Sequence, residues 1–273
     1  MAVDIKRIPD LQFADDDEDE MQDFPLRDGL SWYARRLAEK LLTIARGVML
    51  ISGEPGGGKD LFAISTSAIF KYCFNRPIIL DFKPKRLFGN YRLLGVNEIL
   101  ELVEEVAKQY RVSGIESSAD SKELAQFMQE AIVKWLLEGE GYKIFRGAIY
   151  VVSELKKVAF NRNPMSRTNK FIGTLNSVWR HLDLLEMGTH VYPNEIDVKA
   201  FLQYAKLRAY CSQTLRPNVF RAKIERGMYA GPDFVISNLR MKPLILYIDG
   251  KEPRDFLGGD CFYNLYKTKH MHF

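Results

Sequence analysis

A glycine-rich stretch carries the residue types that bind phosphate groups. Residues 53–60 are Gly-Glu-Pro-Gly-Gly-Gly-Lys-Asp, and the spacing of the glycines and the lysine is that of a phosphate-binding loop, G-x-x-x-x-G-K. Glycines allow backbone N–H groups to converge on phosphate oxygens, and the lysine reaches the β- and γ-phosphates. A purely structural glycine-rich turn is the alternative. The pattern predicts an ATP site formed by Gly53, Glu54, Pro55, Gly56, Gly57, Gly58, Lys59, Asp60 and Leu61.

The last residue of this motif is unusual. A Ser or Thr normally follows the lysine, and its hydroxyl coordinates Mg²⁺, but this chain has Asp60. A carboxylate adds negative charge beside the phosphates. It is also a good oxygen ligand for Mg²⁺, and the metal would offset that charge. We therefore expect Asp60 either to bind Mg²⁺ or to mark a site that binds nucleotide without using it.

A second motif ends the apolar run at 148–152. In P-loop ATPases a strand of this kind ends in Asp-Glu, where the Asp orients the Mg²⁺ shell and the Glu activates water. Here the pair is Ser153-Glu154. Hydroxyl and carboxylate are thus exchanged between positions 60 and 153, which we call the Asp60–Ser153 exchange. It predicts Asp60 and Ser153 as metal residues and Glu154 as the catalytic base. The alternative is an ordinary strand end beside a degenerate site.

The stretch after Glu154 is rich in basic residues and interspersed with asparagines. Such a loop suits contacts to a nucleic-acid backbone that do not depend on base sequence. A solvated surface loop is the alternative. The candidate nucleic-acid-binding residues are Lys156, Lys157, Arg162, Arg167 and Lys170.

A third polar pair, Ser212-Gln213, ends the apolar stretch at 209–213. We expect this strand to lie between the strand that carries Glu154 and the phosphate loop, so that Gln213 senses the γ-phosphate. Three arginines follow, each able to serve a neighbouring subunit as an arginine finger. The sequence does not choose among Arg216, Arg221 and Arg226, and Arg221 is the working candidate.

The elements that position these motifs alternate between strands and helices. Helical patterns cover 29–46, 60–74, 97–110, 123–138, 168–186 and 195–207. Strand patterns cover 48–52, 77–82, 148–154, 209–213, 234–239 and 244–249. Alternation of this kind implies crossover connections and a mainly parallel sheet. The predicted fold class is α/β, with one domain over 29–273.

The composition limits the classes of protein to which this chain can belong. With 47% hydrophobic and 27% charged residues, the chain is typical of a soluble globular protein. It has no apolar run long enough to span a membrane, no signal-peptide pattern, and three widely separated cysteines that predict free thiols. The net charge of +4 conceals an acidic run at 15–20. We expect residues 1–28 to be a flexible acidic segment, either a solvated tail or a competitor of nucleic acid for the basic body.

The three motifs in this order resemble those of the zonula occludens toxin-like (Zot) and phage DNA-packaging group of P-loop ATPases, relatives of the FtsK/HerA and terminase motors. The ending Phe262-Tyr-Asn-Leu-Tyr-Lys-Thr268 resembles the aromatic-x-x-x-Tyr-x-Ser/Thr ending of that ATPase domain. The resemblance implies a P-loop NTPase fold (RecA/ASCE-like) in which Lys59 contacts phosphate, Glu154 is the base and Gln213 the sensor.

The resemblance also implies an ATP- and Mg²⁺-dependent motor that acts on double-stranded DNA as a homo-oligomeric ring. It implies other virion or assembly proteins as partners and the cytoplasm of a host cell as the location, with the virion as a second one. No C-terminal membrane helix and no nuclease domain are evident, which predicts an ATPase-only form. Two other functions stay open: a nucleotide or small-molecule kinase, and a degenerate nucleotide-binding structural subunit.

Overall fold

The computed structural model describes residues 26, 28–30, 32–83, 91–110, 121–159, 166–190, 196–197, 200–230, 233–236 and 243–249. Several sequence predictions fall outside these ranges. They are the acidic run at 15–20, Arg162 among the candidate DNA contacts, and the ending at 262–268.

Six α-helices and nine strands form the described part of the chain. The helices are α1 (Trp32–Leu42), α2 (Lys59–Phe74), α3 (Val96–Gln109), α4 (Ser121–Glu138), α5 (Glu140–Phe145) and α6 (Arg167–Ser177), with short 3-10 turns η2 (Leu155–Lys157) and η4 (Leu202–Tyr204). The strands are β1 (Gly47–Gly53), β2 (Ile78–Leu80), β3 (Tyr91–Leu93), β4 (Ile149–Val152), β5 (Leu185–Thr189), β6 (Ala205–Gln213), β7 (Val219–Ala230), β8 (Asp233–Ile236) and β9 (Leu244–Asp249).

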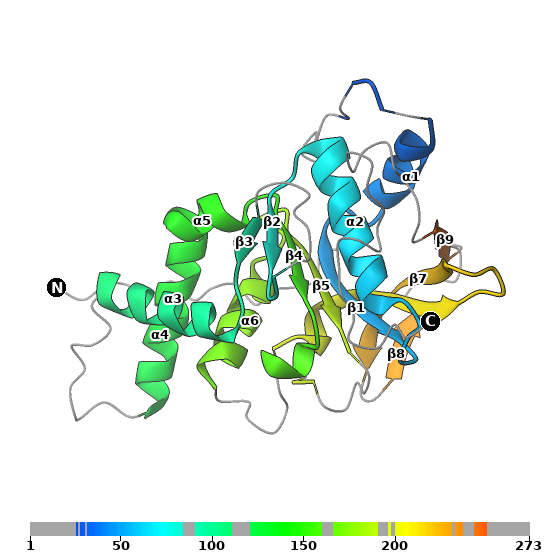
Figure 1. The fold of residues 1–273 in the computed structure, drawn as a ribbon. Coiled ribbons are helices and arrows are strands. Elements are labelled where there is room, and N and C mark those ends of the chain that lie inside the picture. The colour runs from blue at the N-terminus through cyan, green and yellow to red at the C-terminus, as the bar shows by residue number, and fades with distance from the viewer. Residues whose placement is uncertain are drawn as a thin grey trace.

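The strands form one sheet in the order β3-β2-β4-β5-β1-β6-β7-β8, and β9 also pairs with β7 (Figure 1). The strands from β3 to β6 run parallel to one another, whereas β7 is antiparallel to β6, and β8 and β9 are antiparallel to β7. This confirms the predicted α/β fold class with a mainly parallel sheet flanked by helices.

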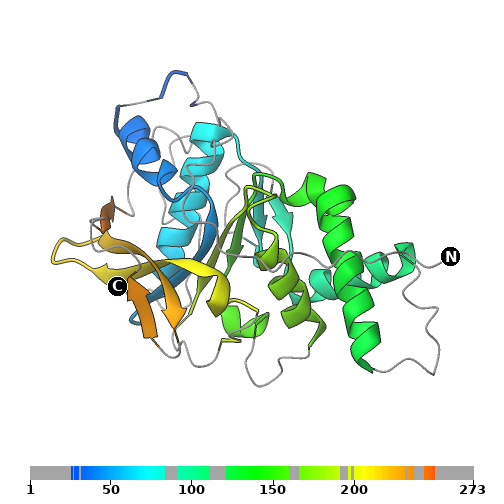
Figure 2. The ribbon, with the colours of Figure 1, turned by 180° about the vertical axis from the view of Figure 1, so that it is seen from behind.

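Helices cover both faces of the parallel strands. Met49 and Ile51 of β1 pack with α1 and α2 in one core cluster, and Val48 and Leu50 pack with α3, α4 and α6 in a second. Figure 1 is seen from the side of α2, and Figure 2 shows the side of α6 from behind. The near-continuous apolar run of β1 follows from its burial on both faces.

Two predicted helices are wrong in part. The helix expected over 168–186 ends at Ser177, and the segment Leu185–Thr189 is strand β5. The helix expected over 195–207 is replaced by the short turn η4 and by the start of β6 at Ala205. The segment Leu-Glu-Met-Gly-Thr has little β-branched character, and burial between two strands overrides its local preference.

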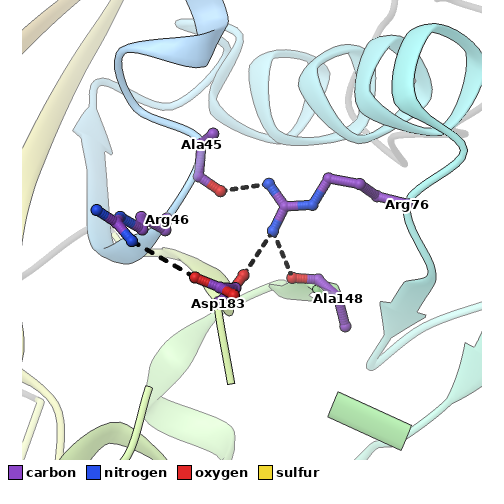
Figure 3. Close-up of polar contacts among 5 residues, drawn as sticks. All are labelled: Ala45, Arg46, Arg76, Ala148 and Asp183. Atoms are coloured by element: carbon purple, nitrogen blue, oxygen red, sulfur yellow. Dashed lines mark hydrogen bonds and ion pairs between the residues drawn. The ribbon is translucent and has the colours of Figure 1, made fainter. Parts of the chain in front are cut away.

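One buried arginine connects the amino ends of three strands (Figure 3). This edge of the sheet lies opposite the phosphate loop, which follows the carboxyl end of β1. Arg76 is 1% exposed, and its Nε donates to the carbonyl oxygen of Gly147 at 2.7 Å. Its other nitrogens donate to the carbonyls of Asp183 at 2.8 Å, of Ala148 at 3.3 Å, and of Ala45. These carbonyls lie just before β1, β4 and β5. A single guanidinium therefore holds the amino ends of three central strands in place.

Candidate nucleotide site

The glycine-rich loop connects β1 to α2 and is pressed against β6 and β7. Gly53 and Gly58 have left-handed φ values of 145° and 86°. A Cβ at Gly53 would lie 2.2 Å from the carbonyl oxygen of Cys211, and one at Gly58 would lie 2.3 Å from the ring of Phe220. Only glycine fits at either position, because backbone conformation and space both exclude a side chain.

Lys59, the first residue of α2, lies across the mouth of this loop. Its Nζ donates to the carbonyl oxygens of Gly53 at 2.8 Å and Glu54 at 2.9 Å. Burial lowers the pKa of Lys59, and the neighbouring charge of Asp60 opposes that shift. The ammonium group and the N-terminus of α2 together place positive charge where phosphate oxygens bind in loops of this type.

Asp60 makes its hydrogen bond with Thr189, the last residue of β5. The Thr189 Oγ1 donates to Asp60 Oδ1 at 3.1 Å and accepts from the backbone N–H of Glu154 at 3.0 Å. Burial raises the pKa of Asp60, and this hydrogen bond is the largest effect that opposes the shift. Thr189 is 2% exposed. One hydroxyl therefore joins the residue after the phosphate-loop lysine to the backbone of the candidate base.

Sequence reasoning missed Thr189 because it missed β5. The strand that ends in Gln213 was expected between β4 and the phosphate-loop strand, and this expectation is wrong. The order is β4-β5-β1-β6, so β5 fills that place and β6 lies on the far side of β1. Gln213 is exposed and pairs with Phe220, and it therefore lacks the position on which its sensor role was based.

Ser153 and Glu154 sit at the end of β4 in different environments. Ser153 is 8% exposed, and its backbone N–H donates to Asp81 Oδ1 at 2.8 Å. Among the described residues, no hydrogen bond joins Ser153 to Asp60. Glu154 has a left-handed φ of 60°, and its half-exposed carboxylate lies 3.0 Å from the Nζ of Lys157. The Glu154 carboxylate is thus open to solvent.

Asp81, which directly follows β2, is a second carboxylate that sequence reasoning did not assign. Its pKa is raised to about 7, chiefly by burial. The hydrogen bond from Ser153 and the charge of Lys157 oppose this shift, while the negative charge of Asp60 adds to it. The available signal was an acidic residue at the carboxyl end of a buried strand, because the carboxyl ends of parallel strands share one edge.

His190 follows Thr189 and is also buried, at 5% exposed. Neither ring nitrogen has a hydrogen-bond partner in the part of the chain that the structure describes. Burial, together with the positive charges of Lys59 and Arg208, lowers its pKa to about 4, so the ring is neutral at physiological pH.

The described candidate DNA contacts differ in their surroundings. Lys157 pairs with Glu154, and the Arg167 guanidinium lies 3.3 Å from the Glu104 carboxylate. Lys170 is half-buried on α6, and Lys156 is exposed on η2. These residues follow the candidate base on the same side of the sheet, from the end of β4 into α6.

The three candidate finger arginines lie at different levels of the β6–β7 hairpin. Arg216 is exposed in the turn that follows β6. Arg221 is half-buried opposite Ser212, and its Nε has no hydrogen-bond partner among the described residues. The guanidinium of Arg226 donates to the carbonyl of Thr43 just after α1, which ties it to the opposite edge of the sheet. Arg226 is therefore the least suited of the three to reach another subunit's phosphates.

The residues of the site fit a magnesium nucleotide. The Gly56 position is open, because a Cβ added there would meet nothing within 4 Å. Carboxylate and hydroxyl oxygens, the ligands that Mg²⁺ takes alongside phosphate and water, are present at Asp60 and Ser153.

No helix in the described ranges is long and apolar enough to cross a membrane. No protein-family model and no curated protein matches this sequence.

Comparison with solved structures finds similar folds at low sequence identity. The N-terminal domain of zonular occludens toxin from Neisseria meningitidis is 18% identical, over 81% of this chain and 99% of that one, with a TM-score of 0.44. A DnaB-like replicative helicase is 10% identical, over 75% of this chain and 56% of that one, with a TM-score of 0.35.

A third similar structure is the genome packaging NTPase B204 from Sulfolobus turreted icosahedral virus 2, solved with AMPPCP. It is 10% identical over 67% of this chain and 93% of that one, with a TM-score of 0.37. The similar structures thus include a Zot N-terminal domain and a genome packaging NTPase, which are the groups that the sequence motifs resemble. Since the identities and TM-scores are low, the roles given below to individual residues rest on this chain's own geometry.

Proposed function

We propose that this chain is an ATP-hydrolysing P-loop motor that acts on double-stranded DNA, in the packaging or translocation of a viral genome. One arrangement supports hydrolysis: the Thr189 hydroxyl joins Asp60, beside the phosphate-loop lysine, to the backbone of Glu154. The backbone of the candidate base is thereby held at a fixed place relative to the phosphate loop, and positioning for an in-line attack depends on such a fixed point.

Each residue of the site has one proposed task. The loop amides and Lys59 hold the phosphates, and Lys59 exchanges its bonds to the Gly53 and Glu54 carbonyls for bonds to phosphate oxygens. Mg²⁺, held by Asp60 and Ser153, supplies charge neutralisation on the phosphates when it is bound. Glu154 orients a water molecule and accepts its proton.

The motor part of the proposal depends on a ring and on DNA. Lys156, Lys157, Arg162, Arg167 and Lys170 are the proposed contacts to the DNA backbone, and an arginine from the next subunit, Arg221 as working candidate, completes the site. Other virion or assembly proteins are proposed partners, and the host cytoplasm or the virion is the proposed location. A nucleotide or small-molecule kinase and a degenerate nucleotide-binding subunit remain the competing functions.

One assay separates these functions: ATP hydrolysis with and without double-stranded DNA, for the wild type, Glu154→Gln and a control. Glu140→Gln is a matched control because Glu140 also forms an exposed ion pair with a lysine three residues later, Lys143. The motor predicts DNA-stimulated turnover that is lost only in Glu154→Gln. Turnover indifferent to DNA would favour the kinase, and binding without turnover would favour the degenerate subunit.

A further inference from the structure

Asp81 is held over the end of the neighbouring strand by two hydrogen bonds. Its backbone N–H donates to the carbonyl oxygen of Val151 at 3.1 Å, and its Oδ1 accepts the backbone N–H of Ser153 at 2.8 Å. Leu80 and Val151 are register partners, which brings the residue after β2 beside the residues that end β4. The carboxylate of Asp81 is thus fixed beside position 153, where the sequence lacks the expected acid.

A continuous run of contacts connects Asp81 to Asp60 along the carboxyl edge of the sheet. The N–H of Ser153 donates to Asp81, the next N–H, of Glu154, donates to Thr189, and the Thr189 hydroxyl donates to Asp60. The negative charge of Asp60 acts on Asp81, and the positive charge of Lys157 acts on both. Two partly buried carboxylates therefore approach the same region beside the phosphate loop.

We propose that Asp81 is the second carboxylate of the Mg²⁺ site, so that the acid absent from position 153 is supplied by the neighbouring strand. Ser153 contributes its backbone N–H, which positions Asp81, in place of a side-chain ligand. The assignment rests on the proposed nucleotide site and replaces the Ser153 half of the Asp60–Ser153 exchange. One N–H leaves acceptor capacity on the Asp81 carboxylate for the metal or for one of its water ligands.

Two features make this arrangement chemically reasonable. Mg²⁺ bound to a nucleotide takes one or two carboxylates and fills the rest of its octahedron with phosphate oxygens and water. Two nearby carboxylates repel each other, and a divalent cation between them converts that repulsion into attraction. Asp60 on the first turn of α2 and Asp81 after β2 would then hold the metal from two elements.

The test measures how the affinity for a fluorescent ATP analogue depends on Mg²⁺ concentration, with the purified full chain. Asp81→Asn removes the charge but keeps an oxygen that can accept the Ser153 N–H. We expect it to raise the half-saturating Mg²⁺ concentration by about tenfold or more, while affinity without Mg²⁺ stays the same or increases. Mn²⁺ bound with the nucleotide, observed by electron paramagnetic resonance, gives a second readout that does not depend on turnover.

Two further variants are compared with Asp81→Asn. Asp183→Asn alters a partly buried carboxylate at the opposite edge of the sheet, where it pairs with Arg46, and should leave the Mg²⁺ dependence unchanged. Ser153→Ala keeps the backbone N–H and removes the hydroxyl, so it distinguishes the two assignments: the Mg²⁺ midpoint shifts in this variant if the Ser153 hydroxyl is itself a ligand. Asp81→Ser, smaller but still an acceptor, replaces Asp81→Asn if that variant fails to fold in a thermal-melting check.

An unchanged Mg²⁺ midpoint in the Asp81 variants would overturn the assignment, as would a shift confined to Ser153→Ala. Equal loss of affinity with and without Mg²⁺ in a folded Asp81 variant would also overturn it, because the effect would not involve the metal. A wild type without DNA-stimulated turnover but with the expected Mg²⁺ shift would remove the motor function and leave Asp81 as a metal ligand.

Discussion

A single hydroxyl, that of Thr189, serves two residues of the site. It donates to the Asp60 carboxylate and accepts from the N–H of Glu154. Because Thr189 is buried, the loss of this hydroxyl leaves a partly buried acceptor and a partly buried donor without this partner. At the scale of residues, the position of the candidate base thus depends on a side chain that itself has no acid–base function.

Thr189→Val tests this dependence, because valine has nearly the same shape and lacks the hydroxyl. We expect ATP turnover to fall on the order of tenfold to a hundredfold, since small displacements of a catalytic group have effects of this size. Nucleotide affinity should change little. Thr174→Val is the control, as the Thr174 hydroxyl is also buried but bonds only the carbonyl of Lys170 in its own helix. Equal turnover in both variants would contradict the positioning role.

Strand β5 is the element that organises the site, and it also contains an unusual buried acid. Glu186 has no exposed surface, and neither carboxylate oxygen has a hydrogen-bond partner in the described part of the chain. Burial raises its pKa well above the ordinary value. The folded state therefore favours the protonated form of this group more than the unfolded state does.

Glu186→Gln should change how stability depends on pH. A raised pKa in the folded state gives stability that is fully present below the unfolded pKa and is lost as pH rises toward the folded pKa. As pH rises above the ordinary carboxyl pKa, the wild type should lose on the order of 1 kcal/mol of stability per pH unit from this group, and Glu186→Gln should not. Urea unfolding at several pH values measures this. Parallel pH profiles for the two proteins would show that Glu186 is not protonated on folding.

The prediction of elements from sequence succeeded where the signal is local. Glycines, a lysine and flanking apolar runs predict β1, the loop and α2, because each residue type has a direct steric or electrostatic task there. It failed for β5, where Leu185, Glu186 and Met187 are ordinary helix formers and only burial between β1 and β4 makes a strand. With β5 missed, the neighbour of the phosphate loop was misassigned and Thr189 was overlooked. Asp81 lies in the predicted strand 77–82, and the sequence pattern gave it no role.

At the scale of the whole molecule, Arg76 connects segments far apart in the sequence. Its guanidinium donates to carbonyls that precede β1, β4 and β5 (Figure 3). Burial lowers its pKa to about 9, so the side chain stays charged at neutral pH. The edge of the sheet opposite the phosphate loop is thereby held by a charged group that has no part in the chemistry.

Arg76→Met should destabilise the fold by about 3 kcal/mol or more, since it leaves several buried carbonyls without donors. Arg46→Met is the matched control: Arg46 forms a partly exposed, 3.5 Å pair with Asp183 at the same edge, and its loss should cost about 1 kcal/mol or less. Urea unfolding of the two variants measures the difference. Similar losses of unfolding free energy in both variants would contradict the role of Arg76 in holding the three strands together.

The proposed DNA surface also belongs to the whole molecule, because its described residues extend from η2 to α6. Lys170→Gln should weaken DNA binding at every sequence tested and lower the slope of log affinity against log salt by about 0.9. Arg167 should contribute less than its charge implies, since it already pairs with Glu104. Lys143→Gln on α5 is the control, and salt titrations of DNA binding compare the variants. A similar change in slope for Lys143→Gln would indicate general electrostatics and no defined surface.

Hydrolysis at this site is tested by the ATP turnover of Glu154→Gln, measured together with nucleotide affinity in the same preparation. Glutamine keeps the size of the side chain and its backbone contact to Thr189 but cannot accept a proton from water. We predict nucleotide affinity close to that of the wild type and a fall in turnover of about a hundredfold or more. Turnover equal to that of the wild type would contradict the assignment of Glu154 as the base, and with it the proposed hydrolytic site.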